Sequence, residues 1–235
     1  MSPAKAEDAL ASLELFAGVT PAVLANLAAA MRERALTSGE LLSGRGDAGD
    51  RLFVVLAGRL RVSVLTSEGR ELSMRIAGPG EMVGEIAVFD GGVRTTDMTA
   101  IEPARVSALP AEAFFKALAL HPEIARNALR MLCRRLRDTT EQLESIALYP
   151  IEQRLARLLL LSLDGAEATP GRRAEVALNL SQTEIAQLLG ATRSKVNVAL
   201  GKLEAAGALR RTPDRVFCYR DKLMRISTAA NARDA

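Results

Sequence analysis

Hydrophobic and polar side chains alternate over much of residues 36–109, and glycines separate the alternating runs. This period of two is typical of half-buried β-strands. The pairs Gly58–Arg59 and Glu68–Gly69 fall between such runs and are typical of hairpin turns. Many short strands at this spacing predict an antiparallel sandwich or barrel. The apolar positions expected to face its core include Leu60, Val62, Val64, Leu72, Met74 and Ile76.

A single long helix is predicted over residues 111–148. Apolar residues recur in its second half at spacings of three and four, which is the heptad pattern of a coiled coil. The positions between them are dense in Arg and Glu, which favours pairing with a second copy of the chain over packing of this face on the barrel. The polar Thr139 in the seam costs stability in a plain zipper and therefore suggests a function. The seam residues are Leu129, Leu132, Leu136, Thr139, Leu143 and Ile146.

The dipeptide Tyr149–Pro150 ends this helix, because the residue before a proline avoids the helical conformation. We therefore expect a hinge at this point. A second apolar helix is predicted from Ile151 to about Leu163, and a loop over residues 164–171 leads into the last part of the chain.

Two helices joined by a short glycine turn are predicted over residues 180–206. Ser181 and Glu184 have the spacing of a capping box at the start of the first helix. Gly190 suits the left-handed turn that ends it, and Thr192 can cap the second helix. This is the pattern of a helix-turn-helix, whose second helix enters the major groove of DNA. An ordinary pair of packed helices is the alternative, and the strands expected after it, over residues 207–220, would be the wing of a winged helix.

Charge divides the chain unevenly. Residues 1–148 carry 17 Lys and Arg against 19 Asp and Glu, whereas residues 149–235 carry 14 against 9, a net charge of +5. A basic last third suggests a polyanionic partner, although simple solubility explains the charge equally well. Together with the helix-turn-helix pattern, the charge favours DNA.

Several classes of protein are disfavoured by the composition. Cys133 and Cys218 are far apart, and the only histidine is His121, so neither a disulfide framework nor a cysteine-held metal centre is indicated. Apolar runs are too short to cross a bilayer, and the N-terminus lacks a secretory signal. We expect a cytoplasmic protein that acts without a membrane or a cofactor.

Residues 84–100, which read GEIAVFDGGVRTTDMTA, contain groups suited to a nucleotide. A short helical turn after Gly84 would direct backbone N–H groups at an anion, and Arg94 can donate two parallel hydrogen bonds to phosphate oxygens. Glu85 is an acceptor that suits the hydroxyl groups of a sugar. The alternative is that Glu85 and Arg94 form an exposed ion pair of no functional consequence.

The motifs together resemble the Crp–Fnr family of transcription regulators, over nearly the whole chain. GDAGDRLFVVLAGRLRV is similar to the barrel strands of that family, GPGEMVGEIAVFDGGVRTTDMTA to its phosphate-binding cassette, and SQTEIAQLLGATRSKVNVALGKLE to its helix-turn-helix. Relatives that sense redox state through an iron–sulfur cluster need several N-terminal cysteines, which this chain lacks. A haem sensor is disfavoured because His121 is the only histidine.

The resemblance implies that a cyclic nucleotide, cAMP or cGMP, is the allosteric ligand. Glu85 would hold the ribose, Arg94 and Thr95 would hold the cyclic phosphate with nearby backbone amides, and the two threonines of the long helix would reach the base, one from each subunit. Threonine after the arginine is favoured by some relatives that bind cGMP, but the hydroxyl alone does not decide between the nucleotides. The implied ligand residues are Gly84, Glu85, Ile86, Ala87, Arg94, Thr95, Arg135, Thr139 and Thr140.

The same resemblance implies the residues that contact DNA. The best-known member presents arginine, glutamate and arginine on its second helix, where this chain has Arg193, Ser194 and Val198. Only the first is kept, so the usual half-site of the family is in doubt beyond the guanine that Arg193 can read. The implied DNA-binding residues are Thr192, Arg193, Ser194, Lys195, Asn197 and Val198.

The sequence therefore predicts an α+β protein that is not an enzyme. We expect an N-terminal jelly-roll-like cyclic-nucleotide-binding β-barrel with N-terminal helices over residues 1–110, a dimerisation helix over 111–148 and a winged helix-turn-helix domain over 149–235. The expected partners are an inverted-repeat operator in double-stranded DNA, a second copy of the chain and RNA polymerase. Two alternatives stay open: a family member with another effector or none, and an enzyme such as a nucleotide hydrolase, which no catalytic motif supports.

Overall fold

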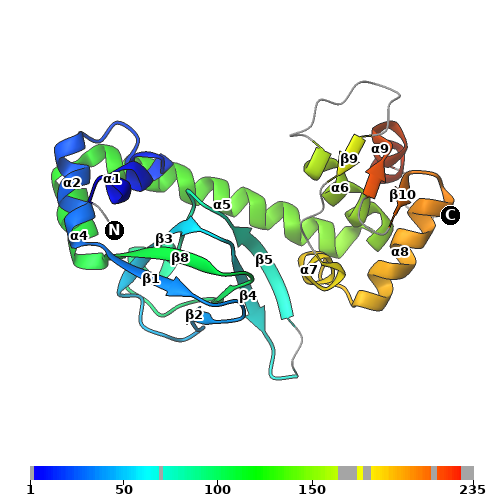
Figure 1. The fold of residues 1–235 in the computed structure, drawn as a ribbon, viewed down its shortest axis with the longest axis horizontal. Coiled ribbons are helices and arrows are strands. Elements are labelled where there is room, and N and C mark those ends of the chain that lie inside the picture. Colours follow the sequence, from blue (N-terminus) through cyan, green and yellow to red (C-terminus); the bar gives the residue numbers. More distant parts are fainter. Residues whose placement is uncertain (1–2, 69–70, 164–173, 177–180, 213–215, 229–235) are drawn as a thin grey trace. The chain divides into compact units, whose positions relative to one another are not determined.

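The computed structural model forms two compact units (Figure 1). The units are Met1–Asp138 and Thr139–Ala235. Among the described residues, none of the helices combines the length and hydropathy that a membrane-spanning segment requires. The described residues are 3–68, 71–163, 174–176, 181–212 and 216–228.

The first unit contains two four-stranded antiparallel sheets. One sheet has the order β1-β8-β3-β6 and the other the order β2-β7-β4-β5, which is the strand arrangement of a jelly roll. The expected jelly-roll-like barrel is therefore confirmed. In chain order the strands are β1 (Arg32–Leu36), β2 (Leu41–Ser43), β3 (Arg51–Ala57), β4 (Leu60–Leu65), β5 (Glu71–Ala77), β6 (Met82–Val83), β7 (Asp97–Ala100) and β8 (Ala104–Pro110).

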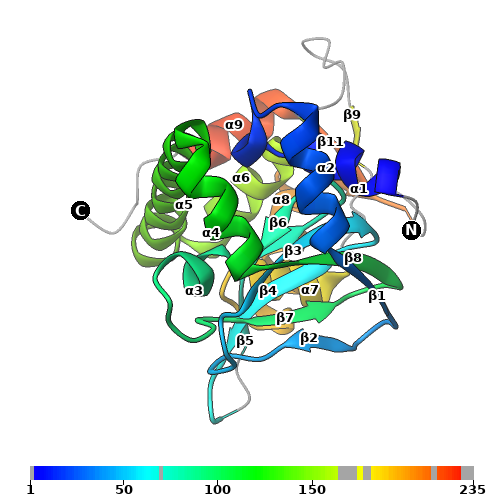
Figure 2. The same cartoon turned by 90° about the vertical axis from the view of Figure 1, so that its left-hand side faces the viewer.

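Strand β3 is buried on both faces, because it lies between two apolar layers. Phe53 and Val55 pack into the core between the sheets, whereas Leu52 and Val54 pack against helices on the outer side of the β1-β8-β3-β6 sheet (Figure 2). A strand buried on both sides reads as a continuous apolar run, as LFVV does here. The helical elements of this unit are α1 (Pro3–Ala11), η1 (Glu14–Phe16), α2 (Pro21–Ala30), α3 (Glu85–Phe89), α4 (Ala111–Leu120) and most of α5 (Pro122–Leu148).

The single helix predicted over residues 111–148 is wrong, because the structure has two helices there. α4 ends at Leu120, and α5 begins at Pro122. His121 between them has φ −130° and ψ 85°, which is not helical. The residue before a proline avoids the helical region, so Pro122 causes the break in the same way as Pro150.

The hairpin predicted at Gly58–Arg59 is also wrong. The strands on either side, β3 and β4, pair in different sheets, so this turn carries the chain from one sheet to the other. Strands β4 and β5 do form an antiparallel pair, with Leu65 opposite Glu71. The turn predicted at Glu68–Gly69 lies partly outside the described residues.

A β-bulge changes the alternation predicted for β5. Arg75 pairs with Val62 and Ser73 with Ser63, so Met74 is the extra residue on its strand. The bulge moves the inward face of β5 by one residue. Ala77 is consequently buried in the core, and Ile76 is not one of the core residues as we had expected.

The second unit is built around the expected helix-turn-helix and a small sheet. Helix α6 covers the predicted range, and β10 and β11 form the predicted antiparallel wing. The buried side chains of α6, α7 and α8 form one apolar core. The loop predicted over residues 164–171 lies outside the described residues. The elements are α6 (Ile151–Leu163), β9 (Ala174–Val176), α7 (Gln182–Leu188), α8 (Arg193–Ala205), β10 (Leu209–Arg211), β11 (Val216–Cys218) and α9 (Arg220–Thr228).

Two features of the crossing between the sheets require a glycine at position 58, the left-handed backbone and the close approach of a neighbouring carbonyl oxygen. Its φ is +72°, and a Cβ placed there would lie 2.4 Å from the carbonyl oxygen of Pro103. We expect Gly58→Ala to lower the free energy of unfolding by about 2–4 kcal/mol, through the left-handed backbone and the overlap together. Gly39→Ala is the matched control, because Gly39 has a φ of +83° in open space. Equal losses in urea unfolding of the two variants would contradict the steric part of this explanation.

Candidate nucleotide cradle and DNA-binding face

A tight cradle forms where strand β6 passes into helix α3. Gly84, which joins them, has φ +84° and is left-handed. A Cβ at this position would lie 2.5 Å from Nη1 of Arg94, so any larger residue would displace that guanidinium. Gly49 is equally close to Ala87 on the other side of α3, where an added Cβ would lie 2.5 Å from the Ala87 Cβ. The glycines let α3 sit against its neighbours.

The Arg94 guanidinium is the buried charge of this cradle, with an exposed fraction of 2%. Its Nη1 donates to the carbonyl oxygen of Gly84 and its Nη2 to that of Arg51, each at 2.7 Å. Nε is buried and has no hydrogen-bond partner among the described residues. Burial lowers the pKa of Arg94, although an arginine in a protein keeps its charge. A cation held in this way attracts an anion.

Glu85 is the acceptor beside this cation, and it is also buried, with an exposed fraction of 6%. Its Oε1 lies 3.5 Å from Nε of Arg135, which projects from α5. Neither Glu85 nor Arg94 is a surface group, so the interpretation of the two as an exposed ion pair is wrong. The pair of opposite charges can hold a polar ligand that has both an anionic group and hydroxyl groups.

The structure brings together four of the residues predicted to hold the ligand. Gly84, Glu85, Arg94 and Arg135 are linked by the contacts above. Ala87 is buried against Gly49, whereas Ile86 and Thr95 are exposed beside them in the sequence. Thr139 and Thr140 are exposed on α5, and Thr139 follows Arg135 by one helical turn. Sequence reasoning missed Arg51 and Gly49. Arg51 contributes through its backbone carbonyl oxygen, and Gly49 contributes because it has no side chain.

Helix α5 has two faces of different character. One face buries Ile124, Asn127 and Ala128, and the Asn127 amide donates to the carbonyl oxygens of Leu15 and Ala17. The seam face is exposed in the single chain, with exposed fractions of 65% at Leu129, 69% at Leu136 and 67% at Leu143. The packing on the first unit and the heptad seam therefore occupy different sides of one helix.

The helix-turn-helix forms through the local signals in its sequence. The Ser181 hydroxyl accepts from the Glu184 backbone N–H at 3.2 Å, and the Glu184 carboxylate accepts from the Ser181 N–H at 2.6 Å. Gly190 has φ +58°, and the Thr192 hydroxyl accepts from the Lys195 N–H at 3.3 Å. These contacts are the predicted capping box, left-handed turn and N-cap. Helix α8 buries Val196, Ala199, Leu200 and Leu203 on its inner face.

The opposite face of α8 is open to solvent. Every side chain that we predicted to contact DNA is exposed, and Val198 is 58% exposed. Nε of Arg193 donates to the side-chain oxygen of Gln182 at 3.5 Å, and this contact helps to hold Arg193 at the N-terminal end of the helix. The exposed residues are Thr192, Arg193, Ser194, Lys195, Asn197 and Val198.

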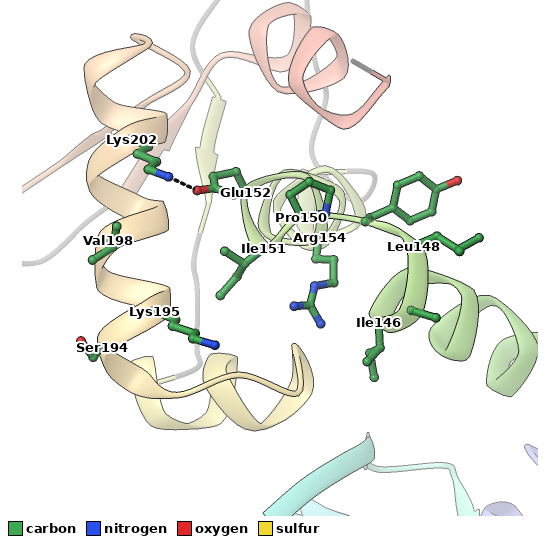
Figure 3. Close-up of a pocket in the computed structure, with 12 residues that line it drawn as sticks. Ile146, Leu148, Pro150, Ile151, Glu152, Arg154, Ser194, Lys195, Val198 and Lys202 are labelled. Carbon is green, nitrogen blue, oxygen red and sulfur yellow. Dashed lines mark hydrogen bonds and ion pairs between the residues drawn. The ribbon is translucent and has the colours of Figure 1, made fainter. Parts of the chain in front are cut away.

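A cavity of about 630 Å³ lies beside this face, between α8 and the segment around Pro150 (Figure 3). Lys195 and Arg154 both point toward this space. Arg154 was missed by the sequence reasoning. Its Nη1 donates to the carbonyl oxygen of Leu189 at 2.6 Å, at the end of α7. On the other side, Lys202 binds Glu152 at 2.5 Å and lowers the pKa of that carboxyl. The cationic groups suit this edge of α8 to phosphate.

Comparisons with known proteins agree with this geometry. Residues 33–121 match the cyclic nucleotide-binding domain family, and residues 153–226 match the Crp-like helix-turn-helix domain family. The CRP-like cAMP-activated global transcriptional regulator of Mycobacterium tuberculosis is 33% identical over 204 residues, which are 87% of this chain and 91% of that protein. The cyclic AMP receptor protein of Thermus thermophilus is 27% identical over 86% of this chain and 90% of its own length.

A solved structure shares the fold. The c-di-GMP responsive global regulator CLP of Xanthomonas campestris has a TM-score of 0.72 at 24% identity, covering 85% of this chain and 99% of its own. The family consists of transcription regulators, which confirms the expectation that this protein is not an enzyme. The chain is a member of the Crp–Fnr family of transcription regulators, with a cyclic nucleotide-binding domain followed by a Crp-like helix-turn-helix domain.

Proposed function

We propose that this protein is a homodimeric, cytoplasmic transcription regulator whose binding to double-stranded DNA is switched by cAMP or cGMP. The observation that carries the proposal is the burial of both Glu85 and Arg94 in the cradle of a cyclic nucleotide-binding domain. Two buried charges of opposite sign are costly to fold around unless a ligand or a partner uses them.

The proposed ligand matches the groups of the cradle. The contacts of Arg94 with Gly84 and Arg51 use two of the five N–H groups that a guanidinium carries, so others can donate to the cyclic phosphate. Backbone amides from Gly84 to Ala87 and the Thr95 hydroxyl would complete the phosphate site. Glu85 would accept a hydrogen bond from the ribose hydroxyl.

The proposed dimer forms along the exposed seam of α5. Two copies of this helix would pair as a parallel coiled coil, with Thr139 and Thr140 from each copy near the base of the nucleotide. A ligand that contacts both helices would favour one arrangement of the pair. The hinge at Tyr149–Pro150 would convert that preference into a rotation of the DNA-binding domains.

In the proposed DNA complex, the two copies of α8 would enter successive major grooves of an inverted repeat, roughly 34 Å apart. Arg193 would read guanine through O6 and N7, whereas Thr192 and Lys195 would contact phosphate. Ser194, Asn197 and Val198 would complete the contact, and Val198 offers only apolar contact, for instance with a thymine methyl group. RNA polymerase is the expected protein partner at a promoter.

The second candidate is a regulator of the same family with another effector or none. The observation that favours it is that both charges of the cradle already have protein contacts, Arg94 with two carbonyls and Glu85 with Arg135. Calorimetry with cAMP and with cGMP distinguishes the two candidates. A regulator switched by a cyclic nucleotide must give heat of binding with at least one of the two, whereas a regulator with another effector or none should give heat with neither.

Removing the buried cation should abolish most of the nucleotide affinity. We expect Arg94→Ala to weaken binding at least about tenfold by titration calorimetry, because a charge-assisted phosphate contact is lost. Glu85→Ala should weaken it as well. Arg105→Ala is the control, since Arg105 is an exposed arginine that pairs with Glu33 in the same barrel. Wild-type affinity in Arg94→Ala, in a variant that still unfolds cooperatively, would contradict the proposed phosphate site.

The dimer should depend on the seam of α5. Leu136→Lys would bring like charges together across the seam, and sedimentation should then show monomers. Leu120→Lys is the control, because Leu120 is 75% exposed on α4, outside the seam. If Leu136→Lys sediments as a dimer like the control, the interface lies elsewhere.

Two residues of α8 should affect DNA binding differently. We expect Arg193→Ala to cost about 1–3 kcal/mol and to relax the preference at one base pair of each half-site. Lys195→Ala should weaken all sequences alike and reduce the dependence of log affinity on log salt by roughly one unit. Selection from random DNA, followed by salt titrations, measures both. An unchanged base preference in Arg193→Ala would show that another residue reads the base.

A further inference from the structure

Arg75 is a charged residue on the inward face of β5. It pairs across the sheet with Val62, which packs on the core between the sheets, and the buried Ala77 follows two residues later on the same face. Only 19% of its side chain is exposed. The bulge at Met74 produces this orientation, because a regular strand would place Ile76 inward instead. Bulges of this kind often direct a side chain toward a functional site.

The guanidinium of Arg75 lies beside the nucleotide cradle. Its Nη2 donates to the carbonyl oxygen of Met82 at 2.7 Å, and its Nη1 is 3.4 Å from Oε1 of Glu81. Nη2 of Arg135 is 3.5 Å from the same Met82 oxygen, and Arg135 also contacts Glu85. Two guanidinium groups therefore meet at one carbonyl. Burial, and then the positive charge of Arg135, lower the pKa of Arg75, while Glu85 opposes that effect.

The charged groups of the cradle follow one another in an order that matches a nucleotide. The Nη1 group of Arg94 donates to the carbonyl oxygen of Gly84, the residue that directly precedes Glu85. The Glu85 carboxylate contacts Arg135, and Arg135 approaches the same Met82 carbonyl oxygen as Arg75. In this series of contacts Glu85 comes between Arg94 and Arg75. With the phosphate at Arg94 and the ribose at Glu85, the base would extend toward Arg75.

We infer that Arg75 is a specificity-determining residue that favours a guanine base, so that the preferred ligand is cGMP. The inference rests on the proposed cyclic-nucleotide function and names the base for it. Arginine offers only hydrogen-bond donors, and its fork matches the adjacent O6 and N7 acceptors of guanine. Adenine presents an amino donor in place of O6, which would face the donors of Arg75. The contacts with Met82 and Glu81 use two of five N–H groups and leave others for the base.

The experiment compares the affinities for cGMP and cAMP in three variants of the full chain by titration calorimetry. We expect the wild type to bind cGMP about tenfold more tightly than cAMP, and Arg75→Met to bring that ratio close to one. Arg75→Lys keeps the charge but not the fork, so the ratio should fall there too. Arg61→Met is the matched control, because Arg61 is 20% exposed on the adjacent strand, faces the opposite side of the sheet and pairs with Glu71.

The outcomes separate this inference from the function on which it rests. A ratio that stays at the wild-type value in both Arg75 variants, or a wild type that prefers cAMP, overturns the assignment of Arg75 and leaves the cyclic-nucleotide function standing. Binding of neither nucleotide by the wild type overturns that function itself. A fall in the ratio in Arg61→Met equal to that in Arg75→Met would show a general effect on the barrel and would also overturn the assignment.

Discussion

The guanidinium of Arg94 is buried between two backbone carbonyls, and the shape of the ligand cradle depends on that contact. The carbonyl oxygens belong to Gly84 and Arg51, so one side chain fixes the start of α3 relative to β3. A Cβ at Gly84 would lie 2.5 Å from Nη1 of Arg94, so the guanidinium keeps this position only beside a glycine. A buried cation is costly without a compensating anion, and a cyclic phosphate would supply both the charge and further acceptors. The contact that shapes the cradle would therefore also favour an anionic ligand.

A second contact connects the cradle to the helix that carries the seam. Glu85 follows Gly84 directly, and its carboxylate meets Arg135 of α5. Asn127, two turns earlier on α5, is bound to the carbonyls around η1. The helix is thus attached to the first unit on one face, while its other face presents exposed leucines. A ligand that competed for Glu85 would change the interactions of α5 near the proposed dimer seam, which is the kind of differential contact that a switch requires.

Features that depend on residues close together in the sequence were predicted well, whereas features that depend on residues far apart in the sequence were not. The helix-turn-helix was predictable in detail, because the Ser181–Glu184 box, Gly190 and Thr192 act within a few residues. The alternation and the glycines predicted an antiparallel sandwich or barrel, and the family resemblance narrowed this to a jelly-roll-like barrel. Its sheet partition was not, because the partners of β3 and β4 are set by strands far along the chain.

The errors have separate physical causes. The rule that located the hinge at Pro150 also predicts a break before Pro122. The rule was not applied there, because the heptad pattern suggested one continuous helix. The bulge at Met74 leaves no signal in an alternating sequence, so the inward position of Arg75 emerged only from the strand register. In the cradle, Glu85 and Arg94 could be predicted from the chemistry of their side chains. Arg51 could not, because it contributes a backbone carbonyl oxygen, which every residue has.

We propose that a ligand in the cradle and DNA on α8 are energetically coupled through one protein. The most direct test measures the dissociation constant for an operator selected from random DNA, at fixed salt, with and without a saturating cyclic nucleotide. Coupling free energies of this kind typically amount to about 1–3 kcal/mol, so we expect the nucleotide to change the dissociation constant at least about fivefold. Reciprocity requires the operator to change the nucleotide affinity by the same factor. Equal DNA affinity in the two conditions, with the nucleotide shown to be bound, would contradict the account.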